Sequence, residues 1–264
     1  MLEVTICIAN YYGHEALELT IESILKRTAY NMYKITVLDS GADYRDLRYL
    51  KQQKAAGNLH LIEYPKQIKH GEAIFELLRR CRTPLACIVD SDIEVLTSTW
   101  LSVLAQPVNE NQSIIGTGVY QPENAVPTRF WRMPRFLPMC LLVNLRAYEK
   151  TGDRDTWRDD WVEAYIDWQD CRQKTLFSKF GAHPYIANGI REKANNQVFG
   201  DTGWRFCEKV SFDYRLPFHR MPYTFYQDHI QHWGAISIWN ADENIPDIQS
   251  KIDAIRKRLA QLRQ

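Results

Sequence analysis

Residues 85–92, Leu-Ala-Cys-Ile-Val-Asp-Ser-Asp, form a short apolar run that ends in two carboxylates. The run predicts a buried strand, because it is short, apolar and followed by polar residues. Two carboxylates separated by one residue repel each other unless a cation or water lies between them. A divalent ion held by carboxylates and by a substrate's phosphates fits this arrangement. The stretch therefore points to a metal-assisted enzyme acting on a nucleotide or phosphate ester.

The sequence before this stretch alternates between short β-branched runs and amphipathic runs. The predicted strands are 4–9, 34–38, 59–62 and 85–89, and the predicted helices are 14–27, 44–56 and 71–81. This alternation predicts an α/β fold with a parallel sheet and helices on both faces. Ligands bind outside the carboxyl ends of the strands in such sheets. Asn10, Asp39 and Asp90 each follow a predicted strand, so we expect them to converge at one edge.

The pattern becomes less regular after Trp100. Residues 113–118 predict another strand, and the Pro- and Arg-rich residues 122–138 predict a loop. Three arginines of this loop suit either an anionic ligand or a solvated basic face, and the second interpretation is favoured. They are Arg129, Arg132 and Arg135.

The bulk composition excludes several classes of protein. The chain of 264 residues has a formal net charge of +1, so it has no global field for nucleic acid or an anionic membrane. No apolar run approaches the roughly 18 residues that span a bilayer. The chain enters a strand directly at Val4, which indicates no signal peptide. The cysteines show no C-x-x-C spacing, which favours free thiols. Together these features predict a cytoplasmic protein.

The last twenty or so residues show a helical period. Apolar residues recur every third or fourth position, at Ile245, Ile248, Ile252, Ile255, Leu259 and Leu262. This spacing predicts an amphipathic helix over 245–264 with a narrow apolar seam. Packing of the helix on its own domain is the simpler interpretation. The alternative is a homo-oligomer formed through Ile248, Ile252, Ile255 and Leu259.

Four segments together resemble family 2 glycosyltransferases with the GT-A fold. They are VTICIANYY at 4–12, ITVLDSG at 35–41, HGEA at 70–73 and IVDSDIEV at 88–95. They are similar to that family's opening strand, base-binding strand, G-x-A helix start and D-x-D segment, in the same order and spacing. The resemblance covers about the first 118 residues.

The resemblance implies a Rossmann-like, mostly parallel sheet with helices on both faces, a less regular acceptor half and a C-terminal helix. Residues 1–118 would form the nucleotide-sugar-binding half, and 119–244 the acceptor-binding half of the same domain. It also implies a metal-dependent, hexosyltransferase-type enzyme. Such an enzyme would move a sugar from a nucleotide-diphosphate donor, with UDP favoured, to a hydroxyl acceptor such as a glycan, by inverting displacement.

Roles for the polar residues at the sheet edge follow from the same resemblance. Asn10 and Asp39 would border the nucleotide base and ribose. Asp90 would meet the ribose or a water in the metal shell. Asp92 would coordinate Mn²⁺ or Mg²⁺, which bridges the donor's diphosphate.

Histidines supply further candidates. His70 precedes Gly71 at a predicted helix start, where it would lie near a phosphate, although an exposed loop histidine is an equal interpretation. The resemblance implies a late histidine as metal ligand. The H-x-G pattern favours His232, with His229 second, and a structural hydrogen bond is the alternative for either.

The segment Gly200-Asp-Thr-Gly-Trp204 supplies a candidate catalytic base. Asp201 would take the proton from the acceptor hydroxyl in an inverting displacement. An Asx-turn in a loop is the alternative interpretation.

Two other classes of protein compete with a transferase. A sugar-nucleotide pyrophosphorylase resembles this chain in fold class and metal use. That class has a Gly-rich, basic loop after the first strand, whereas residues 10–14 contain one Gly and no Lys or Arg. A non-catalytic carbohydrate- or nucleotide-binding protein would have a degenerate site, whereas the acidic residues of this site are intact.

Overall fold

The structure is a computed structural model that describes residues 1–264 except 12, 42–43, 122–134, 150–216, 223 and 234–247. Its strands are β1 Val4–Asn10, β2 Tyr33–Ser40, β3 His60–Tyr64, β4 Leu85–Asp90, β5 Ile93–Val95, β6 Gly116–Gln121, β7 Arg135–Asn144, β8 Phe218–Met221 and β9 Ile230–His232. Its helices are α1 His14–Arg27, α2 Tyr44–Ala55, α3 His70–Arg80, α4 Trp100–Glu110, α5 Leu145–Tyr148, α10 Phe225–Asp228 and α12 Ile248–Arg263.

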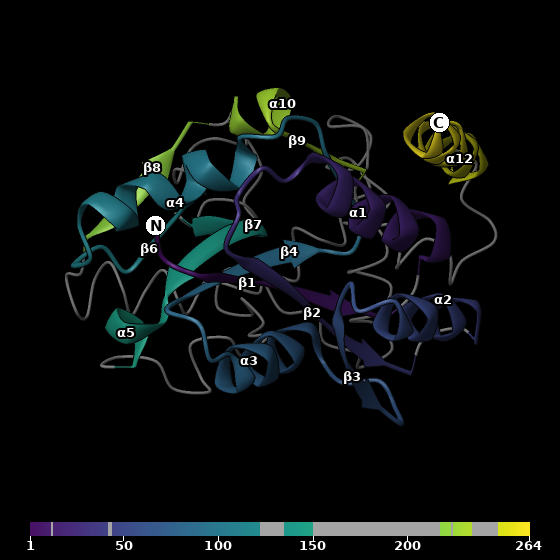
Figure 1. The fold of residues 1–264 in the computed structure, drawn as a ribbon, viewed down its shortest axis with the longest axis horizontal. Helices are drawn as coiled ribbons and strands as arrows, with labels where there is room; N and C mark the ends of the chain where they lie inside the picture. Colours follow the sequence, from purple (N-terminus) through teal and green to yellow (C-terminus); the bar gives the residue numbers. More distant parts are fainter. Residues whose placement is uncertain (12, 42–43, 122–134, 150–216, 223, 234–247) are drawn as a thin grey trace, which may run out of the picture.

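A seven-stranded sheet, in the order β3-β2-β1-β4-β7-β6-β8, forms the centre of the described chain (Figure 1). Strands β1 to β4 pair in parallel. Strand β7 runs antiparallel to both β4 and β6, and β8 is parallel to β6. All strands of this sheet except β7 therefore point the same way, and the predicted α/β, mostly parallel architecture is confirmed.

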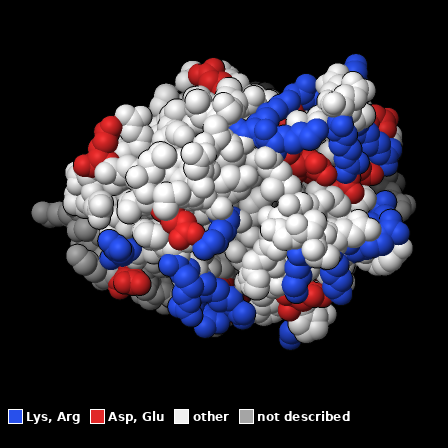
Figure 2. Space-filling view, viewed as in Figure 1, with Lys and Arg blue, Asp and Glu red and all other residues white. Residues whose placement is uncertain are grey.

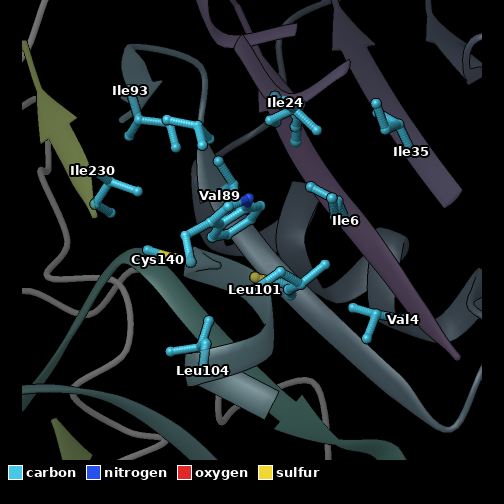
Figure 3. Packing of buried hydrophobic residues seen from close by; sticks show 14 of the residues in the cluster. Val4, Ile6, Ile24, Ile35, Val89, Ile93, Leu101, Leu104, Cys140 and Ile230 are labelled. Atoms are coloured by element: carbon cyan, nitrogen blue, oxygen red, sulfur yellow. The ribbon is translucent and has the colours of Figure 1, made fainter. Parts of the chain in front are cut away.

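Helices cover both faces of the sheet (Figure 1). Helices α1, α2 and α4 pack on one face, and α3 and α5 pack on the other. Figure 3 shows Ile24 of α1 and Leu101 of α4 in the same apolar cluster as Ile6 and Val89 of the central strands. Both faces of β1 and β4 are buried, which is why these strands read as continuous apolar runs rather than as alternating ones.

The predictions for the first ninety residues are confirmed, with boundaries shifted by at most two residues. Later predictions fit less well. The strand expected at 113–118 begins at Gly116, and the loop expected over 122–138 is wrong at its end, because β7 begins at Arg135. Strand β7 is held between β4 and β6, and this pairing overrides the local preference of a Pro- and Arg-rich segment.

Helix α12 lies beside α1 at the periphery (Figure 1). Ile255, Leu259 and Leu262 are buried against Ala16 and Leu19 of α1, as the simpler interpretation of the tail predicts. Self-association through this helix stays a prediction. None of the helices that the structure describes has the length and apolar character needed to cross a membrane.

Candidate active site

Two carboxylates and a histidine meet at the carboxyl end of β4. Asp90 ends β4, Asp92 precedes β5, and His232 ends β9. Strands β5 and β9 form a small antiparallel sheet in which Ile93 pairs with His232. The N–H of Trp233 also donates to the carbonyl oxygen of Asp92, at 2.9 Å. This pairing brings a residue from the end of the chain to the D-x-D segment.

The geometry of this carboxylate–histidine group (Asp90, Asp92 and His232) suits a single metal ion. One ligand atom from each residue lies within 4.8 Å of the others. His232 Nε2 is 3.2 Å from Asp92 Oδ1 and 3.7 Å from Asp90 Oδ2. Ligands about 2.1 Å from one ion lie at most about 4.2 Å apart, so both distances are compatible with shared coordination.

The protonation of the group also fits a cation site. Asp90 Oδ1 is buried and has no hydrogen-bond partner among the described residues, which is costly for a carboxylate oxygen. Burial, with the nearby Asp92 carboxylate, raises the pKa of Asp90 despite the opposing effect of His70 and His232. Burial lowers the pKa of His232, but the carboxylates of Asp92 and Asp90 outweigh it and raise that pKa to about 8. A bound cation would relieve the repulsion between the carboxylates.

The two candidate histidines lie in different surroundings. His229 Nδ1 is 2.7 Å from the hydroxyl oxygen of Thr97, and its ring packs 5.2 Å from that of Phe225. His232 is the histidine that lies beside both aspartates. The geometry therefore favours His232 as a ligand and gives His229 a structural hydrogen bond.

A second polar cluster lies at the ends of β1 and β2. Asn10 pairs with Asp39 in the register of these strands, and its Nδ2 donates to Asp39 Oδ1 at 2.9 Å. Both side chains are almost fully buried. Ala9 pairs with Asp90 across β1 and β4, so this cluster and the carboxylate–histidine group follow neighbouring strand ends. The convergence expected from the sequence is present.

The sequence reasoning missed two members of this second cluster. Asp46, in the first turn of α2, is fully buried, and its Oδ1 lies 3.2 Å from His14 Nδ1. The contact with Asp46 raises the pKa of His14. Asp46 Oδ2 also accepts a long hydrogen bond from Asn10, at 3.5 Å. An acid in the first turn of a helix usually complements the helix dipole, so nothing in the sequence marked Asp46 as buried.

His70 and Gly71 begin α3, which starts near the carboxylates. His70 Nε2 is 3.8 Å from Asp90 Oδ1, and its side chain is partly exposed. Gly71 is buried in the first turn of the helix. The first-turn N–H groups of a helix favour negatively charged ligands, and here they lie at the same end of the sheet as Asp90.

Other candidates lie outside the described residues. These include the proposed base Asp201, together with Arg129 and Arg132. Arg135 begins β7 as part of the sheet.

A mostly parallel sheet with polar side chains at the carboxyl ends of its strands is an architecture typical of ligand-binding α/β enzymes. Residues 5–178 match the sequence model of Glycosyl transferase family 2. The chain therefore belongs to glycosyltransferase family 2. Comparison of the sequence with curated proteins gives no significant match.

A solved structure of low sequence identity has the same fold, and two others are similar over part of the chain. The mannosyltransferase PcManGT from Pyrobaculum calidifontis, in complex with GDP-Man and Mn²⁺, is 13% identical, with a TM-score of 0.50 over 100% of this chain and 88% of that one. GalNAc-T7 with UDP, GalNAc and Mn²⁺ is 14% identical, with a TM-score of 0.48 over 59% of this chain and 38% of that one. S. aureus TarS 1-349 is 13% identical, with a TM-score of 0.44 over 56% of this chain. The matched region spans 48% of the TarS chain and 38% of the GalNAc-T7 chain, which is less than half of each.

Proposed function

We propose that the protein is a metal-dependent glycosyltransferase that moves a sugar from a nucleotide-diphosphate donor to a hydroxyl acceptor. The observation that carries this proposal is the meeting of Asp90, Asp92 and His232 at the end of β4 in a chain of this family. Residues 1–118 would bind the donor, and residues 119–244 would bind the acceptor.

The donor would lie across the carboxyl ends of β1, β2 and β4. Asn10 and Asp39 would hold the base and ribose, because their buried polar atoms lie at the strand ends, where such sheets bind ligands. His70 and the first turn of α3, including Gly71, would face the diphosphate. Asp90 lies near His70 and pairs with Ala9, which precedes Asn10. It would meet the ribose or a water of the metal shell. We favour a UDP-sugar as the donor.

Asp92 and His232 would hold the metal ion. Bound there, it would supply positive charge to the diphosphate leaving group as the bond to the sugar breaks. Carboxylates suit Mg²⁺ and Mn²⁺, whereas an imidazole ligand suits transition metals better. The presence of His232 beside the aspartates therefore favours Mn²⁺ over Mg²⁺.

The acceptor hydroxyl, which we assign to a glycan, would lose its proton to Asp201. A base on the acceptor side suits direct displacement with inversion at the sugar carbon.

Calorimetric titration of the full chain with UDP, GDP, CDP and dTDP, each with Mn²⁺ and with EDTA, tests the proposal. We expect one nucleotide to bind, with binding lost in EDTA and in Asp92→Ala. Asp228→Ala is the matched control, since Asp228 is exposed on the neighbouring helix α10. If none of the four nucleotides binds in a metal-dependent way, the proposal is overturned.

A further inference from the structure

Glu94 is a buried carboxylate two residues after Asp92. It is 1% exposed and lies in the middle of β5. Arg258 of α12 donates from Nε to both carboxylate oxygens at 3.1 Å, and from Nη2 to Oε1 at 2.5 Å. Arg27 of α1 approaches the same Oε1 at 3.2 Å. A buried carboxylate needs such partners, so α12 supplies a bidentate contact on which β5 depends.

Trp233 connects α12 to the other strand of the small sheet. It follows His232 directly, and its carbonyl oxygen accepts a hydrogen bond from Lys251 Nζ at 3.3 Å. Its side chain packs against the apolar cluster between α1 and α12, which includes Ile255. Its backbone N–H donates to the backbone carbonyl oxygen of Asp92. Helix α12 therefore contacts both β5 and the residue that follows the histidine of the carboxylate–histidine group.

We propose that α12 is a positioning element of the metal site, acting through Arg258 on Glu94 and through Lys251 on Trp233. These contacts hold β5 and β9 in the register that sets His232 beside Asp92. The inference rests on the proposed function, because it assigns a role towards the metal that Asp92 and His232 would bind. Residues that orient metal ligands typically contribute about 10- to 100-fold to metal affinity.

Two other ion pairs of α12 do not reach β5 or β9 and serve for comparison with Arg258. Arg256 pairs with Glu15, and Arg263 pairs with Glu18, both on the surface of α1. Figure 2 shows Lys and Arg side chains interspersed with Asp and Glu side chains in the part of the surface where α12 lies. Removal of Arg256 takes an ion pair from the same helix without touching β5 or β9, which makes it a matched control for Arg258.

The test is a calorimetric titration of the full chain with Mn²⁺ alone. We expect Arg258→Ala to raise the dissociation constant by about 10- to 100-fold. Lys251→Ala should raise it less, because this variant also removes a positive charge that acts on His232. Arg256→Ala should leave it within about twofold, because exposed ion pairs contribute little. Circular dichroism checks that each variant is folded. Arg258→Lys keeps the positive charge beside Glu94 but loses the planar fork, so this variant serves if Arg258→Ala does not fold.

A double-mutant cycle separates positioning from general stability. If Arg258 acts through His232, then Arg258→Ala should change Mn²⁺ affinity much less in a His232→Ala background than in the native one. An unchanged affinity in both Arg258→Ala and Lys251→Ala would overturn the inference. So would an equal loss in Arg256→Ala, or an equal loss with and without His232. Failure of the native chain to bind Mn²⁺ would instead overturn the proposed function, and the inference with it.

Discussion

Thr20 binds both backbone polar groups of Ile93. Its hydroxyl donates to the carbonyl oxygen at 2.7 Å and accepts the N–H at 3.1 Å. Ser23, one turn further along α1, accepts the N–H of Val95 at 2.9 Å. Strand β5 pairs with β9 on one edge, and these helix side chains satisfy its other edge. The segment that carries Asp92 is therefore fixed between a helix and a strand.

Replacement of Thr20 by Val should destabilise the fold by about 2–6 kcal/mol. The side chain keeps its shape, but both polar groups of Ile93 lose their partner in a buried place, at about 1–3 kcal/mol each. Urea unfolding measures the free energy. Thr20→Ser keeps the hydroxyl and should cost much less. Equal stability of the two variants would show that the hydroxyl contributes nothing.

Mn²⁺ affinity should rise with pH. His232 has a pKa of about 8 in the metal-free protein, and a metal binds only the neutral imidazole. Below that pKa we expect affinity to increase by about tenfold per pH unit, and above it to level off. Titration with Mn²⁺ between pH 6 and 9 measures this. His229→Ala should keep the profile, whereas His232→Ala should flatten it. A flat native profile would contradict the assignment of His232 as a ligand.

The metal-free protein should lose stability as pH rises through 8. The pKa of His232 is raised above its ordinary value of about 6.5, so the folded state holds its proton more tightly than the unfolded state. The gain is complete below pH of about 6.5, amounts to at most about 2 kcal/mol, and is lost as pH passes the folded value. Unfolding in EDTA at several pH values should show this difference between the native protein and His232→Gln. Parallel curves for the two would count against it.

Asp90→Asn should stabilise the metal-free fold and weaken metal-dependent binding of the donor nucleotide. The pKa of Asp90 is raised by burial and by Asp92, so its charge is unfavourable in the folded state at neutral pH. The amide keeps the shape and removes the charge. Thermal unfolding in EDTA and nucleotide titration with Mn²⁺ measure the two effects. A lower melting temperature in EDTA would mean that the contacts of Asp90 with His232 and His70 outweigh its burial.

The parallel half of the sheet could be predicted because its signals are local. Each strand from β1 to β4 is a short apolar run, and each helix between them has its own apolar period. Asn10, Asp39 and Asp90 were found because strand ends in a parallel sheet meet at one edge. The pairing of the parallel strands is enough to bring these positions together, since Asn10 lies opposite Asp39 and Ala9 lies opposite Asp90.

The rest depended on contacts between distant segments. Strands β5 and β9 are too short to show a period, so His232 was assigned with Asp92 to the metal by resemblance, and nothing local predicted that the two strands pair. Glu94 stands between two apolar residues, and nothing local marks Arg258 as its partner. Asp46 carried the ordinary signature of a helix start although it is buried. Such pairs are set by tertiary packing, which overrides local patterns.

The antiparallel pairing of β5 with β9 also sets an order of events during synthesis. Asp92 and His232 are separated by about 140 residues, which a ribosome adds in roughly 7–28 seconds at about 5–20 residues per second. During that interval the parallel strands β1 to β4 are complete, but the histidine that neutralises the two carboxylates has not been made. A nascent chain would therefore present the strand ends of the proposed nucleotide site before the proposed metal site is complete. Competence to hold the proposed metal would therefore arise only after residue 232 has been added to the chain.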